Sequence, residues 1–415
     1  MSGYADRHVV VTGLGAVCPV GNTMPDAWDA LVHGRSGVGR ITHFDPSAYA
    51  VQIAGEVKGF DPAGHIDPKT ARHMDRHAQL AVVAAREALA DADLAITDNN
   101  RDRVGVVVGS AAGGVRTLLD AQQTLETRGP NRVNPFFLPN FLADAATGHI
   151  AILTGAAGPN LSTVSACATG GHALGEAMHM IKRGDADAMI AGGTDTVVLP
   201  ITLAGFINMK GLASDNERPE QASRPFDRDR GGFVISEAAA ILVLEELEHA
   251  RARDARVYAE IVGYGATNDA FHMFAQAEDG EGAARAMARA LTSAGMNPDD
   301  LDYINAHGTG TPLNDRVETL AIKRTFGDHA YRLAVSSTKS MTGHMMGASG
   351  ALEGAISALV IAHGVIPPTI NLDTPDPDCD LDYVPNVARD TRVRAALSNS
   401  IGLGGHNATI ILKAV

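Results

Sequence analysis

Runs of apolar residues that end in glycine recur along the chain and alternate with stretches of helical periodicity. The first run occupies Val9–Gly15, and similar runs occupy Val104–Gly109 and Ala188–Gly193. Each pattern predicts a buried strand that ends in a glycine turn. Between these runs, Ala78–Leu89 and Gly171–Lys182 have the spacing of helices. Strands that alternate with helices indicate an α/β fold.

A weak internal repeat divides this α/β pattern into two parts. The segment Ser162–Gly193 predicts a strand, a turn with a cysteine, a long helix and a second strand. The segment Ala334–Pro368 follows the same plan, with a lysine in its turn. A repeated plan indicates repeated architecture, so we expect two similar halves. We place them at residues 1–255 and 256–415, without a long linker between them.

Composition narrows the class of protein. The 415 residues are 45% hydrophobic and 20% charged, which is typical of a large buried core. The net charge of −14 argues against nucleic acid as a partner. We find no apolar run of the roughly 18 residues that a membrane span needs, and Met1–His8 lacks the apolar stretch of a secretory signal. We therefore expect a cytoplasmic protein that binds neither nucleic acid nor a membrane.

Cys167 is the candidate nucleophile among three widely spread cysteines. It follows a short β-type run, Leu161–Val164, and precedes a helix rich in alanine and glycine. A helix N-terminus stabilises a thiolate, and such sites lower the thiol pKa to about 3.5–7.5. The alternative is a small buried hydrophobe, which is how we interpret Cys18 and Cys379. The spacing of the cysteines indicates neither a disulfide framework nor a metal site, and it favours a reducing compartment.

Two of the 16 histidines are candidates to act with this thiol. His307 precedes a glycine and His344 follows one, and each lies at the end of a strand-like segment. Glycine neighbours allow close approach of a substrate, although a buried core histidine is the alternative for each. A thiol with two imidazoles can hold an acyl group as a thioester and stabilise a developing oxyanion. His172, one helical turn beyond Cys167, is better explained by packing, and we expect no catalytic metal.

With these motifs the chain resembles the elongating β-ketoacyl-acyl-carrier-protein synthases over essentially its full length. The segments that carry the resemblance are Val164–Gly170, Ala222–Asp227, Asn305–Pro312, Val335–Gly350 and Pro368–Leu372. The resemblance implies a thiolase fold, in which two duplicated α/β halves form an αβαβα layered arrangement. It also implies a homodimer, or a heterodimer with a subunit like a chain-length factor.

The resemblance assigns a reaction to the three candidate residues. Cys167 would take an acyl chain from the 4'-phosphopantetheine arm of an acyl carrier protein. Malonyl on a second carrier protein would lose CO2, and its carbanion would attack the Cys167 thioester. His307 and His344 would stabilise the enolate, and the backbone N–H groups of Cys167 and Leu403 would form the oxyanion hole. No permanently bound cofactor is implied.

Further positions match the family's supporting residues. Lys339 and Glu353 match a lysine that supports the site electrostatically and its acidic partner, although Glu353 could also lie on a solvent face. Thr309 and Thr311 match hydroxyls that bind the pantetheine arm, or stabilise a turn. The resemblance also places Asp315 and Glu318 in a structural network beneath the site.

Docking of the acidic carrier protein would use a basic patch. Lys69 and Arg72 match that patch in relatives, and a solvated helix face is the alternative interpretation. Another basic docking position of some relatives corresponds to Asp215 here, which removes one expected contact.

The chain departs from the family in its acyl pocket. Relatives carry a Phe-Gly-Phe-Gly-Gly turn whose second phenylalanine is a gate, but here Ile401 and Leu403 replace both rings. Ala112 stands where many relatives place a large residue that lines the pocket floor. These losses of volume predict a tunnel for long or rigid chains, such as conjugated polyenes. That substrate would suit type II polyketide synthesis, and housekeeping fatty-acid elongation is the alternative.

Three related classes fit the motifs less well. A thiolase would carry a second catalytic cysteine near the C-terminus, and residues 401–407 contain none. An initiating, CoA-primed synthase would pair its cysteine with histidine and asparagine, whereas His344 occupies the third position here. A non-catalytic chain-length partner would lack Cys167.

Overall fold

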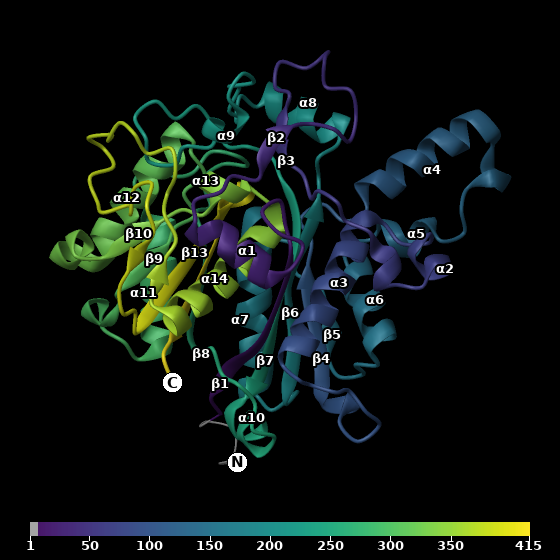
Figure 1. The fold of residues 1–415 in the computed structure, drawn as a ribbon, viewed down its shortest axis with the longest axis horizontal. Helices are drawn as coiled ribbons and strands as arrows, with labels where there is room; N and C mark the ends of the chain where they lie inside the picture. The colour runs from purple at the N-terminus through teal and green to yellow at the C-terminus, as the bar shows by residue number, and fades with distance from the viewer. Residues whose placement is uncertain (1–6) are drawn as a thin grey trace.

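The computed structural model describes residues 7–415, and a ten-stranded sheet runs through it (Figure 1). Residues 1–6, most of the segment that was expected to lack a secretory signal, lie outside the described part. In spatial order the strands are β10 (Ala334–Ser336), β9 (Tyr303–Asn305), β13 (Ala395–Gly402), β14 (His406–Lys413), β8 (Ala259–Asn268), β1 (Val9–Val17), β7 (Glu237–Glu246), β6 (Ala188–Thr196), β4 (Val104–Gly109) and β5 (Asn160–Leu161). Two pairs of short strands stand apart: β2 (Val38–Arg40) with β3 (Ile53–Gly55), and β11 (Val365–Ile366) with β12 (Arg389–Asp390).

The large sheet consists of two five-stranded halves with the same internal order. Counted along the chain within each half, the third strand lies at the outer edge, followed by the second, fourth, fifth and first. The two first strands, β1 and β8, meet in antiparallel pairing through only Val10 with Glu260 and Val11 with Ala259. This short contact joins the two halves of the sheet. The proposed division near residue 255 falls just before β8 begins.

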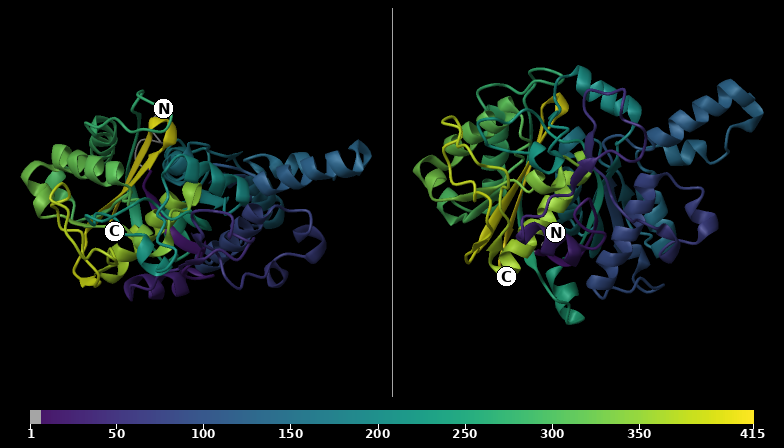
Figure 2. Two further views of the ribbon diagram at one scale, coloured as in Figure 1. Left: turned by 90° about the horizontal axis from the view of Figure 1, so that it is seen from above. Right: turned by 45° about the horizontal axis from the view of Figure 1, so that its top comes forward.

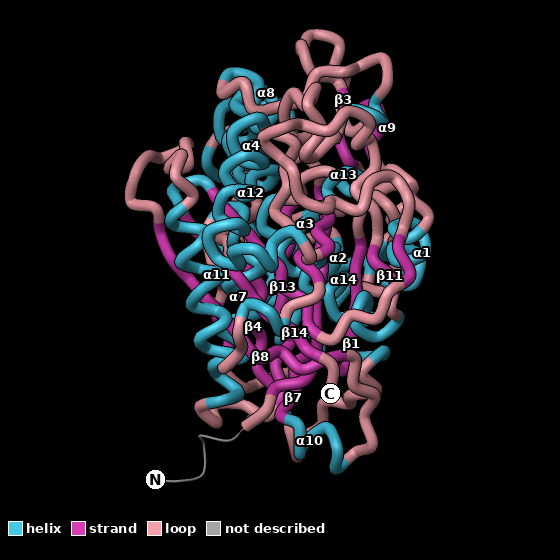
Figure 3. The backbone as a smooth tube through the Cα atoms, turned by 90° about the vertical axis from the view of Figure 1, so that its left-hand side faces the viewer, coloured by secondary structure: helices cyan, strands magenta, loops and turns pink. Residues whose placement is uncertain are grey.

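Two helices lie between the halves, and other helices cover the outer faces (Figures 1 and 3). The inner layer is α7 (Thr169–Lys182) and α14 (Ser349–His363), which contact each other and strands of both halves. The outer layers are α3 (Arg76–Asp91) with α6 (Ala145–Thr154), and α11 (Glu281–Ala294) with α12 (Pro312–Phe326). The expected αβαβα arrangement is therefore confirmed.

The remaining helices are short or peripheral. They are α1 (Met24–Val32), α2 (Pro68–Ala71), α4 (Val115–Arg128), α5 (Phe137–Phe141), α8 (Pro200–Asn208), α9 (Pro219–Ala222), α10 (Leu247–Ala252) and α13 (Lys339–Thr342). Among these, α4 projects from the body of the molecule as an arm (Figure 2). The strands and helices predicted from periodicity are present, but the strand before Cys167 ends at Leu161 rather than Val164.

The inner helices pack unusually close at their N-terminal ends. A Cβ atom added at Gly170 would lie 2.6 Å from the backbone nitrogen of Ala351 and 2.7 Å from the carbonyl oxygen of Gly347. Small residues therefore allow the two backbones to touch. The sequence analysis found no apolar run long enough to cross a membrane, but the helical stretch Met346–His363 is long and apolar enough to do so. In the structure 83% of that stretch is buried, so it is the core helix of the inner layer.

Matching turns lead into the two inner helices. A 3₁₀ turn at Ala166–Ala168 precedes α7, and a 3₁₀ turn at Met346–Ala348 precedes α14. Each turn begins with a residue in the left-handed region, Ala166 at φ 49° and Met346 at φ 50°. Positions 167 and 347 are therefore equivalent in the two halves. Both turns direct a helix N-terminus toward the same space, where the candidate residues gather.

Candidate active site

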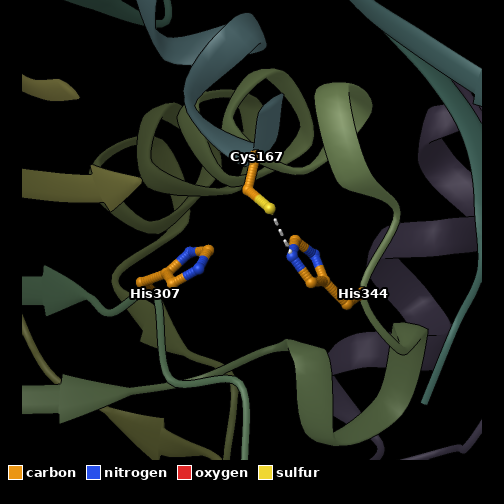
Figure 4. Close-up of side chains that lie close together, drawn as sticks. All are labelled: Cys167, His307 and His344. Atoms are coloured by element: carbon orange, nitrogen blue, oxygen red, sulfur yellow. Dashed lines mark hydrogen bonds between the residues drawn. The ribbon is translucent and has the colours of Figure 1, made fainter. Parts of the chain in front are cut away.

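The structure brings Cys167, His307 and His344 together at the junction of the two halves (Figure 4). One ring nitrogen of each histidine and the Cys167 sulfur all lie within 4.8 Å of one another. His344 Nε2 is 3.0 Å from Cys167 Sγ, which is hydrogen-bond distance. All three side chains are buried. A nucleophile and two imidazoles from distant parts of the chain thus face one space.

Backbone and side-chain contacts hold the two rings in place. His307 follows β9, and its backbone N–H and that of Gly308 each donate to the Glu318 carboxylate at 2.8 Å. The backbone N–H of His344 donates to the carbonyl of Val234 at 2.7 Å. His344 Nδ1 lies 3.1 Å from Ser349 Oγ, so the opposite nitrogen is directed at the sulfur. These contacts preorganise the rings before any substrate binds.

Burial keeps both imidazoles neutral. Desolvation, and then the positive charge of Lys339, lowers the pKa of His307 and of His344 well below the usual value. A neutral imidazole has one donor and one acceptor nitrogen, so each ring can either donate a hydrogen bond or accept a proton, depending on its tautomer. Lys339 and Glu353 form an ion pair in the core, with 1% and 0% of their surfaces exposed. Burial raises the pKa of Glu353 to about 7.

The protonation state of the Cys167 thiol differs from the one that the sequence analysis predicted. Burial raises the pKa of Cys167 to about 11, and the Leu403 backbone N–H and the Lys339 charge offset this only in part. The expectation of a lowered pKa is therefore wrong for the resting pocket, because desolvation outweighs the helix N-terminus. The thiol keeps its proton at rest. His344 Nε2, at 3.0 Å, is placed to accept that proton when the sulfur attacks.

Two backbone N–H groups, those of Leu403 and of Cys167 itself, approach the sulfur. These are the groups that the sequence analysis assigned to the oxyanion hole. Gly402 allows this approach, because a Cβ there would lie 3.1 Å from the Cys167 backbone nitrogen. The turn from Gly402 to Gly405 therefore packs directly over the nucleophile.

A cavity of about 340 Å³ leads to the three residues. Its lining includes four residues assigned to substrate binding: Thr309, Thr311, Ile401 and Leu403. It also includes apolar side chains that the sequence did not single out: Phe206, Phe233, Phe274 and Met346. Ala112 is not in this lining; it packs on the apolar cluster that contains Cys167, beyond the mapped cavity. Its role in the pocket floor stays a prediction.

The sequence analysis missed a buried acid, Asp195, which links the loop that contains Ala112 to the turn that follows His344. Asp195, at the end of β6, accepts hydrogen bonds from Ser110 Oγ at 2.7 Å, Ala112 N at 3.1 Å and Gly347 N at 2.6 Å. A carboxylate at the carboxyl end of a predicted strand was the available signal. Asp315 forms a similar support, accepting from the backbone nitrogens of Phe226 and Gly310.

The candidate docking residues lie on the surface. Lys69 and Arg72 are exposed at α2. Lys210, which the sequence analysis missed, is exposed and lies in the lining of the cavity. Asp215 forms an ion pair with Arg218 at 2.8 Å. The cavity therefore has a basic residue at its lining, but that residue is Lys210 and not position 215.

Comparison with known proteins fits this geometry. The family model described as "Beta-ketoacyl synthase, N-terminal domain" matches residues 6–250, and the corresponding C-terminal domain matches residues 258–373. The chain belongs to the β-ketoacyl synthase family. A 3-oxoacyl-[acyl-carrier-protein] synthase 2 of Staphylococcus aureus (strain N315) is 52% identical and covers 98% of both chains. One from Synechocystis sp. is 50% identical and covers 100% of this chain and 99% of the relative.

Solved structures of the family share the fold. The ishigamide ketosynthase/chain length factor superposes with a TM-score of 0.90 at 37% sequence identity, covering 99% of each chain. The thiolase fold expected from the resemblance is thereby confirmed, and so is the family itself.

Proposed function

We propose that the protein is an elongating β-ketoacyl-acyl-carrier-protein synthase that joins malonyl to an acyl chain held on Cys167. The observation that carries this proposal is the 3.0 Å contact between Cys167 Sγ and His344 Nε2, with a second neutral imidazole, His307, at the same space. The relatives named 3-oxoacyl-[acyl-carrier-protein] synthase 2 support the same chemistry.

The first half-reaction loads the enzyme. Cys167 Sγ attacks the acyl thioester of a carrier protein while its proton passes to His344 Nε2. The backbone N–H groups of Cys167 and Leu403 stabilise the oxyanion that develops. Collapse of this intermediate expels the pantetheine thiolate, which takes the proton from His344. The imidazole is then neutral again.

The second half-reaction forms the carbon–carbon bond. Malonyl thioester enters the cavity, where Thr309 and Thr311 are placed to bind its pantetheine arm. Loss of CO2 places negative charge on the thioester oxygen, and His307 donates a hydrogen bond to it. His344 also donates, from Nε2, once its proton has moved from Nδ1 to Nε2 and the Ser349 hydroxyl donates to Nδ1. Such preorganised donors contribute roughly 3–4 kcal/mol each. The enolate carbon attacks the Cys167 thioester, the bond between the acyl carbon and the sulfur breaks, and the Cys167 thiolate that leaves takes a proton from solvent. The product is a chain two carbons longer on the carrier protein.

Mass spectrometry of the protein incubated with an acyl-acyl-carrier protein tests this proposal. We expect one acyl adduct per chain, on the peptide that contains Cys167, and loss of condensation in Cys167→Ser. Cys18 and Cys379 are buried free thiols and provide internal controls. An adduct on either of them, or full condensation activity in the Cys167→Ser variant, would contradict the assignment.

The acyl chain that the enzyme accepts has two candidate classes. The 50–52% identity to the synthase 2 relatives favours fatty-acid elongation in the cytoplasm. Type II polyketide assembly is favoured by the aliphatic Ile401 and Leu403 in the cavity. It is also favoured by the likeness, at 35% identity and a TM-score of 0.90, to a ketosynthase solved with its type II PKS acyl-carrier protein. Competition between saturated and polyenoyl thioesters for the purified enzyme separates the two. Rejection of polyenoyl chains with restriction to short saturated ones would eliminate the polyketide reading.

The carrier protein delivers both substrates, and no permanently bound cofactor is proposed. Lys69 and Arg72 supply the cationic surface for this acidic partner, and Lys210 extends it to the cavity. Charge reversal at Lys210 should raise KM for the carrier-bound substrate with little change in kcat. Asp215→Lys, with the opposite sign, is the matched comparison.

A second subunit covers the arm of the molecule in this proposal. Strand β5 forms the outer edge of the sheet, and both of its residues are exposed. No residue of α4 is buried, and large apolar side chains of this region face outward. They are Leu118, Leu119, Leu125, Phe136, Leu138, Leu142, Ile152, Leu161 and Val164. A homodimer, or a heterodimer with a chain-length-factor-like subunit, would bury this surface. Leu138→Asp should shift the mass in solution toward a monomer.

A further inference from the structure

The catalytic trio has the donor set of a zinc site as well as that of a ketosynthase. A thiol and two imidazoles are ligands that bind Zn²⁺, and three protein ligands with one open position are typical of catalytic zinc centres. Among the described residues, Cys167, His307 and His344 offer three ligand atoms that all lie within 4.8 Å of one another. We infer that this trio binds Zn²⁺ or a similar borderline-soft cation, and that the bound ion inhibits the enzyme.

The distances allow the ion to bind with small movements. In a tetrahedral site with Zn–S near 2.3 Å and Zn–N near 2.0–2.1 Å, neighbouring donor atoms stand roughly 3.5 Å apart. The His344 nitrogen and the sulfur are 3.0 Å apart, and the widest separation in the trio is within 4.8 Å. Side-chain rotations that move the donor atoms by about 1 Å would therefore bring them to tetrahedral spacing. The cavity of about 340 Å³ leaves room for water as the fourth ligand.

One of the three ligands, His344, has the kind of hydrogen-bond partner that supports the ligands of zinc sites. The imidazole of a zinc ligand commonly bonds through its other nitrogen to a fixed partner, which sets the ring orientation. His344 Nδ1 has such a partner in Ser349 Oγ at 3.1 Å. The Lys339 ammonium opposes a cation here, but its ion pair with Glu353 reduces that opposition.

Binding involves proton release and no redox change. Zn²⁺ replaces the thiol proton of Cys167, a Zn–S bond forms, and the proton leaves to solvent. The ion is then bonded to the Cys167 sulfur, which is the atom that must carry the acyl group. The metal and the acyl chain therefore cannot be bound at the same time. The inhibition part of this inference rests on the proposed function, whereas the binding part does not.

Cobalt(II) substitution provides a direct test of binding, because a Co²⁺–thiolate bond absorbs in the near ultraviolet. We titrate the full-length protein with Co²⁺ and expect one equivalent per chain to produce this absorption and excess Zn²⁺ to remove it. Protein whose Cys167 has been capped with iodoacetamide should show no such absorption. Absorption that survives capping would place the metal elsewhere and overturn the inference.

Variants then assign the nitrogen ligands. His307→Asn and His344→Asn should each weaken Co²⁺ binding at least tenfold, whereas His272→Asn, an exposed histidine near the cavity, should not. Circular dichroism verifies that each variant is folded. Equal affinity in all three variants would overturn the inference.

Inhibition is measured separately. Zn²⁺ should abolish condensation at one equivalent, a chelator should restore it fully, and enzyme already acylated on Cys167 should be resistant. Co²⁺ binding with no loss of condensation would refute the inhibition. Absence of any condensation activity before metal is added would instead refute the proposed function and leave the binding result intact.

Discussion

Substitution of either member of the buried Lys339–Glu353 pair should destabilise the fold, but by unequal amounts. Both side chains lie in the core, and burial raises the pKa of Glu353 above its ordinary value. Lys339→Met leaves a carboxyl group that takes up a proton near neutral pH and becomes uncharged. Glu353→Gln instead leaves an ammonium group with no anionic partner. We therefore expect the second substitution to destabilise the fold more than the first at pH 7, and the two deficits to change with pH in opposite directions.

The magnitude follows from proton affinities. If the unpaired Lys339 must lose its proton at pH 7, the cost is about 4.6 kcal/mol, because its reference pKa lies roughly 3.4 units higher and each unit is worth about 1.36 kcal/mol. Breaking a buried ion pair by removing one partner typically costs about 3–5 kcal/mol, which agrees. For Lys339→Met the unpaired Glu353 takes up a proton instead, which at pH 7 costs about 3.7 kcal/mol, because its reference pKa lies roughly 2.7 units lower.

Denaturant unfolding at several pH values measures both costs. In Glu353→Gln the deficit should shrink by about 1.36 kcal/mol for each unit that the pH rises above 7, because a neutral lysine becomes easier to form. The double variant Lys339→Met/Glu353→Leu removes both charges and is the matched control. Equal destabilisation by the two single variants, or a Glu353→Gln deficit that does not change with pH, would refute the reasoning.

Lys339→Met also affects catalysis through the two imidazoles. Lys339 lowers the pKa of His307 and of His344, so its removal raises both values toward normal. In the proposed mechanism the neutral rings are the active form, so activity should be lost as pH falls through their pKa. The acidic limb of malonyl decarboxylation should therefore move to higher pH in Lys339→Met. A profile that superposes on that of the wild type would contradict the electrostatic role.

Three further substitutions have expected outcomes. His307→Ala should slow malonyl decarboxylation by roughly 10²–10³-fold, measured as CO2 release, while mass spectrometry still finds the acyl adduct. Ala112→Phe should shorten the products without abolishing decarboxylation, and unchanged product length would remove Ala112 from the pocket floor. Gly347→Ala should destabilise by about 1–3 kcal/mol, since its Cβ would lie 2.6 Å from Asp195 Oδ2. Gly205→Ala, where a Cβ meets nothing within 4 Å, is the control, and equal melting temperatures would refute the packing argument.

The alternation of apolar runs and helices was sufficient to predict the α/β class and several elements. Val104–Gly109 is a strand with the predicted bounds, and the helix predicted over Ala78–Leu89 lies within α3. The order of the strands was inaccessible to periodicity, because pairing across the sheet depends on contacts between residues far apart in sequence. The resemblance to a family supplied the layered arrangement.

The site was predictable in its residue types and not in its energetics. Cys167, His307 and His344 stood out by local context, but the thiol pKa depends on desolvation, which only the folded core determines. Asp195 escaped notice for a similar reason, since its partners at Ser110 and Gly347 are distant along the chain. Lys210 carries no local signal, and its place at the cavity follows from the position of α8.

The matching turns before α7 and α14 bear on how a duplicated fold came to have a single reactive centre. Two copies of one architecture would begin with two equivalent elbows, and position 347 is the counterpart of position 167. Gly347 has no room for a side chain, because Asp195 and the Ala111 backbone occupy that volume. The turn before α14 therefore has no room for a second thiol, and the C-terminal half contributes the two imidazoles instead. Packing at one glycine is enough to make two otherwise matching turns chemically different.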